Sequence, residues 1–113
     1  MSGITTHVLD TGKGKPGVGI NIVLEKKISS GYERIGGGIT NNDGRLPGLL
    51  DENYNLEKGI YRISFDTESY YKEQGQKCFY PEASIVFEIE NPSEHFHVPL
   101  LISGYGYSTY RGS

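Results

Sequence analysis

The sequence predicts an all-β fold, a two-sheet β-sandwich of about eight short strands with one short helix. Apolar and polar residues alternate with a period of two along most of the chain, as in Ala83–Glu90, where Ile85, Phe87 and Ile89 share one face. The 113 residues include 16 Gly and 9 Tyr but no Trp, a composition that favours a turn-rich β protein. Segments rich in Gly, Pro and Asn separate the alternating runs and predict tight turns, for example at Asn41–Gly44.

The first half of the chain is predicted to contain three strands, at Ile4–Leu9, Val18–Glu25 and Tyr32–Thr40. Thr11–Gly17 is predicted to be a hairpin turn, because it is glycine-rich but lacks the ending of a phosphate-binding loop. Gly36–Gly38 lies inside the third strand and indicates a β-bulge or the close approach of another backbone. In the second strand, the residues expected to face the core are Val18, Ile20, Ile22 and Leu24.

The second half is predicted to contain one helix and four further strands. The helix lies within Thr67–Gln76, where Thr67 is the expected N-cap and Gly75 the expected end. One strand precedes the helix and three follow it, at Ile60–Asp66, Ala83–Glu90, Phe96–Ile102 and Gly106–Arg111. Alternation assigns to the core Tyr61, Ile63 and Phe65 in the first of these strands, and Phe96, Val98, Leu100 and Ile102 in the third.

Length and charge exclude several classes of protein. The length predicts a single domain that spans residues 1–113. The net charge is -3, the pI is near 5.6 and Lys26-Lys27 is the only adjacent basic pair, so we expect no nucleic-acid partner. Cys78 is the single cysteine, which excludes an intrachain disulfide. No apolar run approaches the ~20 residues of a membrane-spanning helix, so no membrane partner is expected.

The N-terminal residues predict the compartment. The segment after Met1 has neither the basic nor the apolar region of a secretory signal. We therefore expect a cytoplasmic protein. A peroxisomal location is the alternative, although the final Arg-Gly-Ser is not a visible peroxisomal signal.

Two histidines of the Phe96–Ile102 region are expected to leave the core together. His95 and His97 are two residues apart, so both imidazoles project from the face opposite Phe96 and Val98. Such a pair could hold zinc with a third ligand, but the sequence offers no second ligand pair, and we expect no metal. The alternative is a pair of surface histidines on a solvated sheet face.

Two further polar residues are distant in sequence. His7 shares one face of the first strand with Thr5 and Leu9. Arg45 follows a turn in which Gly44 permits a positive φ, so its backbone is held at the start of the next segment. Taken singly, each is an ordinary surface residue, and they form a site only if the fold brings them together.

The C-terminal residues are polar and aromatic in a pattern that favours an ordered end. Tyr110 combines a large apolar body with a polar tip, and Arg111 is a planar donor suited to a carboxylate or a polarised carbonyl. The carboxylate of Ser113 adds a fixed negative charge. The alternative is an edge strand whose charges keep it soluble.

Four segments in this order resemble the 5-hydroxyisourate hydrolases, the transthyretin-like enzymes of urate breakdown. They are Thr5–Thr11, Thr40–Arg45, His97–Leu101 and Tyr107–Ser113. The resemblance spans the whole chain, and the terminal Tyr-Arg-Gly-Ser is the signature of the family. Hormone-carrying transthyretins share the fold but would be expected to lack His7, Arg45, His97 and this terminus as a set.

The resemblance implies a homotetramer, a dimer of dimers with its sites in the channel between dimers, and no cofactor. It implies hydrolysis of the ring amide of 5-hydroxyisourate, a purine-derived small molecule, to 2-oxo-4-hydroxy-4-carboxy-5-ureidoimidazoline. The implied catalytic residues are His7, His97, Arg45 and Ser113. The implied substrate-binding residues are His7, Arg45, Tyr110 and Arg111.

These side chains suit amide hydrolysis without a metal. An imidazole with a pKa near neutrality is an efficient general base, so His7 and His97 are expected to position and deprotonate the water. Arg45 is expected to hold the substrate and stabilise the oxyanion, and Ser113 to orient a histidine or the water. The alternatives are a transthyretin-type carrier of a small aromatic ligand and a monomeric β-sandwich interaction module without catalysis.

Overall fold

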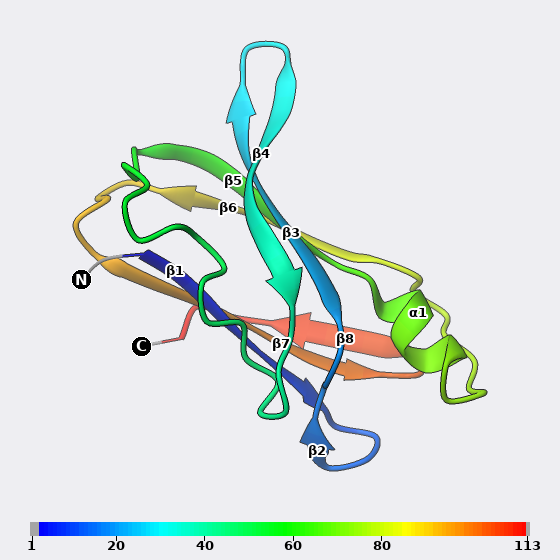
Figure 1. The fold of residues 1–113 in the computed structure, drawn as a ribbon. Helices are drawn as coiled ribbons and strands as arrows, with labels where there is room; N and C mark the ends of the chain where they lie inside the picture. The colour runs from blue at the N-terminus through cyan, green and yellow to red at the C-terminus, as the bar shows by residue number, and fades with distance from the viewer. Residues whose placement is uncertain (1–2, 113) are drawn as a thin grey trace.

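The computed structural model describes residues 3–112, which form two four-stranded β-sheets packed against each other and one helix at the end of the sandwich (Figure 1). The first sheet has the strand order β2-β1-β7-β8, and the second has the order β4-β3-β5-β6. The elements are β1 (Gly3–Asp10), β2 (Lys15–Pro16), β3 (Asn21–Ile28), β4 (Gly31–Ile39), β5 (Gly59–Phe65), α1 (Thr67–Lys72), β6 (Ala83–Ile89), β7 (His95–Ser103) and β8 (Gly106–Thr109). The predicted two-sheet sandwich with one short helix is confirmed.

The core between the sheets contains most of the side chains that alternation assigns to it. In β5, the fully buried residues are Tyr61, Ile63 and Phe65. In β7, the buried residues include Phe96, Val98, Leu100 and Ile102. Burying one large apolar side chain contributes about 1.5–3 kcal/mol to the free energy of folding, so the apolar side of each strand turns toward the core. The opposite face of β7 therefore carries His95 and His97.

The second predicted strand differs from the observed one at its start. β3 begins at Asn21, and Val18 is 43% exposed, so the inward assignment of Val18 was wrong. The backbone bends before the strand, because the Gly17 N–H donates to the Val8 carbonyl at 2.9 Å and Gly19 has a φ of 78°. This bend interrupts the alternation that the sequence pattern extends back to Val18.

Two glycine-rich segments behave as predicted. Thr11–Gly17 forms a hairpin connection, in which β2 pairs antiparallel with the end of β1. Gly36–Gly38 admits a neighbouring backbone: the Gly37 N–H donates to the Leu49 carbonyl at 2.9 Å, and a Cβ on Gly36 would lie 2.1 Å from the same oxygen. The long loop between β4 and β5 is therefore held against the sandwich beside β1 (Figure 1).

The helix is capped by a different residue from the one predicted. The Asp66 carboxylate accepts hydrogen bonds from the Ser69 N–H at 3.1 Å and from the Ser69 hydroxyl at 2.7 Å, so Asp66 is the N-cap. Thr67 lies inside the helix, and its hydroxyl donates to the Tyr80 carbonyl. Gly75 has a φ of 68° and lies just beyond the last turn, as predicted.

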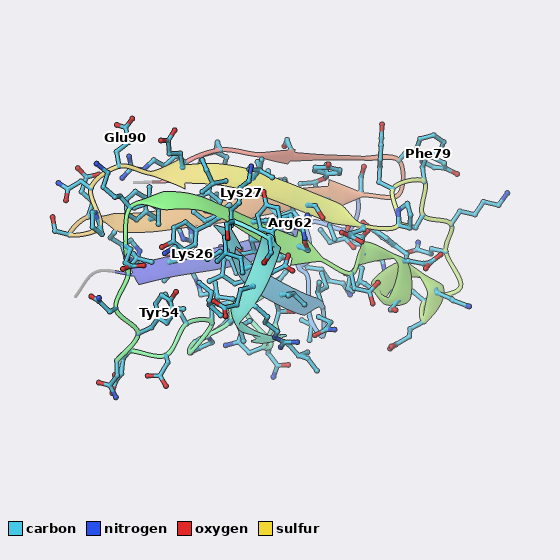
Figure 2. All side chains as sticks on the ribbon, turned by 90° about the horizontal axis from the view of Figure 1, so that it is seen from above. Lys26, Lys27, Tyr54, Arg62, Phe79 and Glu90 are labelled. Atoms are coloured by element: carbon cyan, nitrogen blue, oxygen red, sulfur yellow. The ribbon has the colours of Figure 1, made fainter. Side chains whose placement is uncertain are left out.

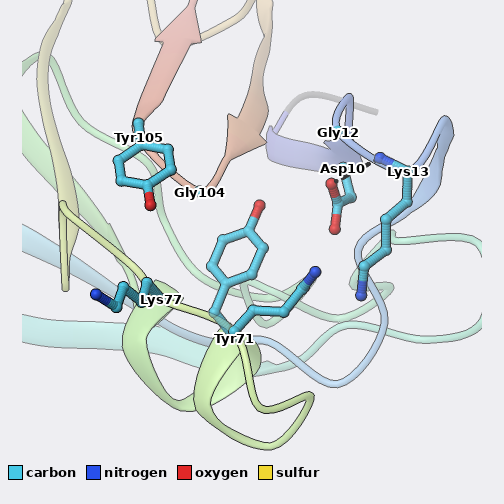
Figure 3. A pocket seen from close by; sticks show the side chains of 8 residues that line it. Asp10, Gly12, Lys13, Tyr71, Lys77, Gly104 and Tyr105 are labelled. Atoms are coloured by element: carbon cyan, nitrogen blue, oxygen red, sulfur yellow. Dashed lines mark hydrogen bonds between the residues drawn. The ribbon is translucent and has the colours of Figure 1, made fainter.

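The helix is tied to the first sheet by a buried hydrogen bond. The Tyr70 hydroxyl donates to the Asp10 carboxylate at 2.8 Å, and Asp10 is only 1% exposed. Burial, with the adjacent Asp10 carboxylate, raises the pKa of Tyr70 to about 12. Tyr71 and Asp10 line the same pocket, where Lys13 donates its backbone N–H to the carboxylate at 3.2 Å (Figure 3).

The outer face of the second sheet carries paired charges. On this face Arg62 donates to Glu25 at 2.8 Å and stacks over the Tyr32 ring at 3.9 Å. Lys26 stands opposite the buried Tyr61, on the other face of β3, and pairs there with Glu57. Figure 2 shows Lys26 and Arg62 between the two ends of the sandwich. Exposed ion pairs contribute about 0–1 kcal/mol each, so they mainly keep this face polar. The first sheet instead presents imidazoles on its outer face.

Candidate active site

The site begins with a hydroxyl between two imidazoles on the outer face of the first sheet. β1 runs parallel to β7, in a register that places Thr5 opposite His97. The Thr5 Oγ1 lies 2.8 Å from Nδ1 of His97 and 3.0 Å from Nε2 of His95. Strand parity predicts that both histidines leave the core, and the structure confirms it, since His95 is exposed and His97 is partly buried.

His7 follows Thr5 on the same face of β1. Its Nε2 lies 2.9 Å from the Asp43 carbonyl, which can only accept, so Nε2 carries the hydrogen and Nδ1 holds the lone pair in the neutral ring. The carbonyl thus selects one tautomer of His7 and fixes the orientation of its ring.

Arg45 lies beside His7 because a tight turn docks on β1. His7 and Arg45 form an antiparallel β-bridge, and the Gly44 carbonyl accepts from the Val8 N–H at 2.8 Å. The Asn41 side chain closes the turn by accepting from the Arg45 N–H at 3.0 Å. Arg45 is exposed, and none of the carboxylates in residues 3–112 forms an ion pair with it. Its guanidinium is therefore available to bind an acceptor.

Gly44 is the residue that this turn requires. Its φ is 76°, in the left-handed region, and a Cβ at this position would lie 2.3 Å from the Val8 carbonyl oxygen. Only a residue without a side chain allows the turn to pack this closely on β1. The position of Arg45 beside His7 follows from that contact.

The electrostatic surroundings hold His97 in its neutral form. Partial burial of the ring lowers its pKa, and the positive charge of Arg45 lowers it further, with smaller contributions from His95 and His7. Because an ordinary histidine has a pKa of about 6.5, His97 is an unprotonated base at neutral pH. His7 stands opposite Pro99, two residues along β7 from His97, and Arg45 bridges to His7, so these groups lie in the same part of the sheet.

The C-terminal segment continues beside β7 past the end of β8. β8 stops at Thr109, earlier than the predicted Arg111, because Pro99 has no N–H to donate in this register and its carbonyl accepts the Thr109 hydroxyl at 2.7 Å. The pairing resumes where the Gly112 N–H donates to the His97 carbonyl at 2.8 Å.

Gly112 packs directly on the His97 ring. A Cβ on Gly112 would lie 2.5 Å from Cδ2 of His97, so the two residues share a face of the sheet. Tyr110, which is 60% exposed, lines a pocket together with His97. Ser113, to which a catalytic role is assigned by resemblance, lies outside the described residues.

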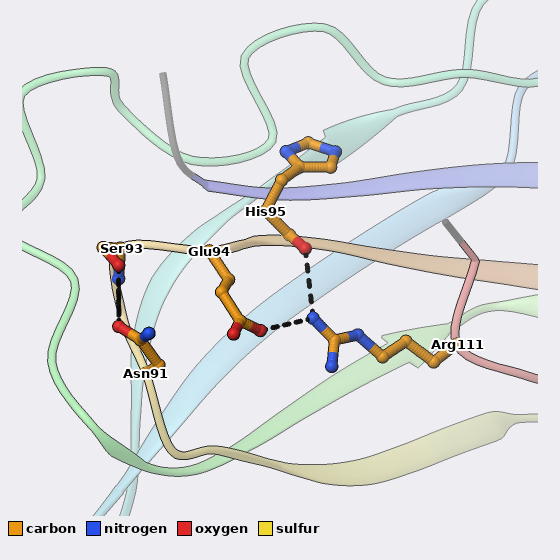
Figure 4. A network of polar contacts seen from close by, with 5 residues as sticks. All are labelled: Asn91, Ser93, Glu94, His95 and Arg111. Carbon is orange, nitrogen blue, oxygen red and sulfur yellow. Dashed lines mark hydrogen bonds and ion pairs between the residues drawn. The ribbon is translucent and has the colours of Figure 1, made fainter.

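Arg111 lines a pocket together with Tyr110 and His97, but its guanidinium turns away from the histidine rings. Since Gly112 faces the His97 ring, Arg111 has the opposite parity, and its guanidinium stacks over the Phe96 ring at 4.7 Å. It also donates to Glu94 at 2.9 Å and to the His95 carbonyl at 3.4 Å, on the side away from the His95 ring (Figure 4). The substrate-binding role of Arg111 stays a prediction.

Sequence reasoning did not select Thr5 as a site residue. The parity of β1 places it on the face of His7, but only the parallel register with β7 brings its hydroxyl to the two imidazoles. Thr5 and His95 also line a groove of about 620 Å³ beside the loop between β4 and β5. Within residues 3–112, no group of three or more His, Cys, Asp or Glu side chains could hold a metal ion. The helix described here is too short to cross a membrane.

The chain is similar to known proteins over nearly its whole length. Residues 4–112 match the family described as HIUase/Transthyretin. The chain is 45% identical over 114 residues to the 5-hydroxyisourate hydrolase of Mus musculus, covering 99% of this chain and 96% of that one. It resembles the solved structure of the Klebsiella pneumoniae 5-hydroxyisourate hydrolase with a TM-score of 0.85 and 33% identity, covering 100% and 94% of the two chains.

A structure of sea bream transthyretin in complex with thyroxine is also similar. Its TM-score is 0.89 at 29% identity, and the match covers 96% of this chain and 93% of that one. The fold is thus shared by an enzyme and by a protein solved with a hormone. The match over residues 4–112 and the identity to the mouse protein place this chain in the HIUase/Transthyretin family.

Proposed function

We propose that this protein hydrolyses the ring amide of 5-hydroxyisourate, giving 2-oxo-4-hydroxy-4-carboxy-5-ureidoimidazoline. The observation that carries the proposal is the gathering of His7, Arg45 and His97 on the outer face of the first sheet, from three distant parts of the sequence. The names of the similar mouse and Klebsiella proteins support the substrate.

The chemistry is water attack on an activated amide carbonyl. His97 is neutral at pH 7, so it can take a proton from the water as the carbon–oxygen bond forms. Arg45 cannot lose its proton, and it supplies a fixed positive charge for the oxyanion of the tetrahedral intermediate. His7, held by the Asp43 carbonyl, orients the water or the substrate.

We also propose that the enzyme is a homotetramer, a dimer of dimers whose sites lie between dimers. The outer face that carries Thr5, His7 and His97 is only partly covered in one copy of the chain, and a second copy would exclude water from it. Ser113 and Tyr110 would complete the wall of the site. Sizing chromatography with light scattering tests the assembly, and a monomer at working concentration contradicts it.

The alternative function is a carrier of a small aromatic ligand. The similarity to the transthyretin solved with thyroxine favours it. The set of His7, Arg45 and His97 favours the hydrolase, because binding alone does not require a neutral general base beside an exposed guanidinium. Tight thyroxine binding without ring opening would favour the carrier.

The decisive experiment uses freshly made substrate. Urate oxidase converts urate to 5-hydroxyisourate, whose absorbance decay is followed with and without the protein. We expect acceleration by the natural chain, a loss of roughly 10²- to 10⁴-fold in His97→Asn, and a large loss in Arg45→Lys. Arg34→Lys, which changes an exposed arginine of β4, is the matched control. If 5-hydroxyisourate decays no faster with the protein than in buffer, the hydrolase proposal is wrong.

The proposed compartment is the cytoplasm. An N-terminal fluorescent fusion tests it while leaving the C-terminal residues unchanged. Diffuse fluorescence is expected, and punctate fluorescence that overlaps a peroxisomal marker would contradict it.

A further inference from the structure

The Thr5 hydroxyl connects two imidazoles in one hydrogen-bonded chain. Its Oγ1 lies 2.8 Å from Nδ1 of His97 and 3.0 Å from Nε2 of His95. Thr5 and His97 are partly buried, whereas His95 is exposed and lines the groove beside the β4–β5 loop. The chain of three groups therefore runs from the proposed base to solvent.

Counting hydrogens shows that the two tautomers are coupled. A hydroxyl has one hydrogen to donate and lone pairs to accept with. When both rings are neutral, Thr5 can donate to only one of the two imidazole nitrogens, so at least one ring donates its N–H to the Thr5 oxygen. When the hydroxyl hydrogen is also used in this chain, Thr5 donates to one ring and accepts from the other, and the hydrogen position on His97 then fixes the hydrogen position on His95.

General-base chemistry selects one of the two arrangements. For Nε2 of His97 to accept a proton from water, it must hold the lone pair, so Nδ1 carries the hydrogen and donates to Thr5. The hydroxyl then donates to Nε2 of His95, whose own hydrogen is on Nδ1. In the opposite arrangement, Nε2 of His97 is already protonated and cannot act as a base.

We propose that Thr5 and His95 form a proton relay behind His97, in which the proton taken from the attacking water ends on His95. This inference rests on the proposed hydrolase function. As the water oxygen bonds to the carbonyl carbon, its O–H bond breaks and Nε2 of His97 gains the proton. Nδ1 of His97 gives its proton to the Thr5 oxygen, and the Thr5 hydroxyl proton moves to Nε2 of His95.

The relay leaves the positive charge where it costs least. His97 returns to a neutral ring with its hydrogen on Nε2, and His95 becomes an imidazolium in contact with water. A cation on His97 is opposed by partial burial and by the charge of Arg45, whereas the exposed His95 ring can be hydrated. The charged and titratable groups of the described residues that act on His97 are Arg45, His95 and His7.

Substitutions of Thr5 test the bridging hydroxyl. Thr5→Val keeps the branched shape but removes the hydroxyl, and we expect kcat to fall about 10- to 100-fold, as it does when outer partners of a functional imidazole are lost. KM should change little, because Thr5 acts through His97 and not on the substrate. Thr5→Ser should restore most of kcat. The control is Thr11→Val, which removes a hydroxyl that donates to the Ile102 carbonyl at the far end of β1.

Substitutions of His95 test the proton acceptor. His95→Gln can still hydrogen-bond to Thr5 but cannot accept a proton, so kcat should fall by a similar factor. Added imidazole should raise the kcat of His95→Gln and leave the natural chain unaffected. The double variant Thr5→Val/His95→Gln should be no slower than either single variant, because the two groups act as one unit.

A spectroscopic measurement separates this inference from the proposed function. In the ¹⁵N-labelled natural chain, long-range ¹H–¹⁵N spectra at neutral pH should show the His97 hydrogen on Nδ1 and the His95 hydrogen on Nδ1, with a change at His97 in Thr5→Val. An inactive natural chain would defeat the hydrolase proposal whatever the spectra show. Active Thr5→Val with unchanged kcat, a Thr5→Ser as slow as Thr5→Val, or a natural His97 protonated on Nε2 would each overturn the relay.

Discussion

Replacing Gly112 by Ala probes how closely the C-terminal segment holds the proposed base. The added Cβ would lie 2.5 Å from Cδ2, 3.1 Å from Cγ and 3.2 Å from Cβ of His97. Carbon atoms in ordinary contact are about 3.5–4.0 Å apart, so the ring or the terminal segment must move by roughly 1 Å. No positive φ is needed at Gly112, which leaves the contact as the reason for the glycine.

A shift of this size reaches the hydrogen bond behind the ring. Nδ1 of His97 is 2.8 Å from the Thr5 hydroxyl, and adding about 1 Å takes the pair beyond hydrogen-bonding distance. A misplacement of about 1 Å in a catalytic group costs on the order of 10²-fold in rate. We therefore expect kcat/KM of Gly112→Ala to fall by roughly 100-fold, with an overpacking cost of about 1–3 kcal/mol in stability.

The assay is 5-hydroxyisourate decay, with urea unfolding measured on the same preparations. Gly106→Ala is the matched control, because a Cβ there would meet only the Ser103 Oγ at an ordinary 3.9 Å. If Gly112→Ala were as active as Gly106→Ala, the packing of the terminus on His97 would not position the base.

Three further predictions concern His97, Gly44 and Asp66. Because the pKa of His97 is lowered, kcat/KM should stay high as the pH falls to about 6.5 and decline only below it. Arg45→Met should raise the His97 pKa in an NMR titration, and a His97 titration midpoint above pH 6.5 in the natural chain would contradict the reasoning. Gly44→Ala should lower the free energy of unfolding in urea by roughly 1–3 kcal/mol more than Gly48→Ala does. Gly48 has a similar φ of 79° but no atom within 4 Å of the added Cβ, so equal losses would show that the turn at Gly44 can shift to accommodate a side chain. Asp66→Ala should cost about 1 kcal/mol in urea unfolding and Asp66→Asn much less, and no difference between them would remove Asp66 as the N-cap.

Much of the fold could be predicted because burial acts on each strand separately. The period of two decides which residues of β5 and β7 enter the core, and that choice needs no knowledge of neighbouring strands. The same rule predicts that His95 and His97 leave the core together. It failed at Val18, where a bend between Gly17 and Gly19 interrupts the strand, and at Thr67, where the carboxylate of Asp66 takes the cap position.

The sequence by itself determined the two-sheet sandwich, the faces of its strands and, through the resemblance, the family and the set of His7, Arg45 and His97. Only the tertiary structure decided how those residues meet. Pairing between segments far apart in the chain sets the register, and one step of register turns a side chain to the other face. That is why Gly112 contacts His97 while Arg111 turns away to Glu94, and why the hydroxyl of Thr5 reaches both imidazoles of β7.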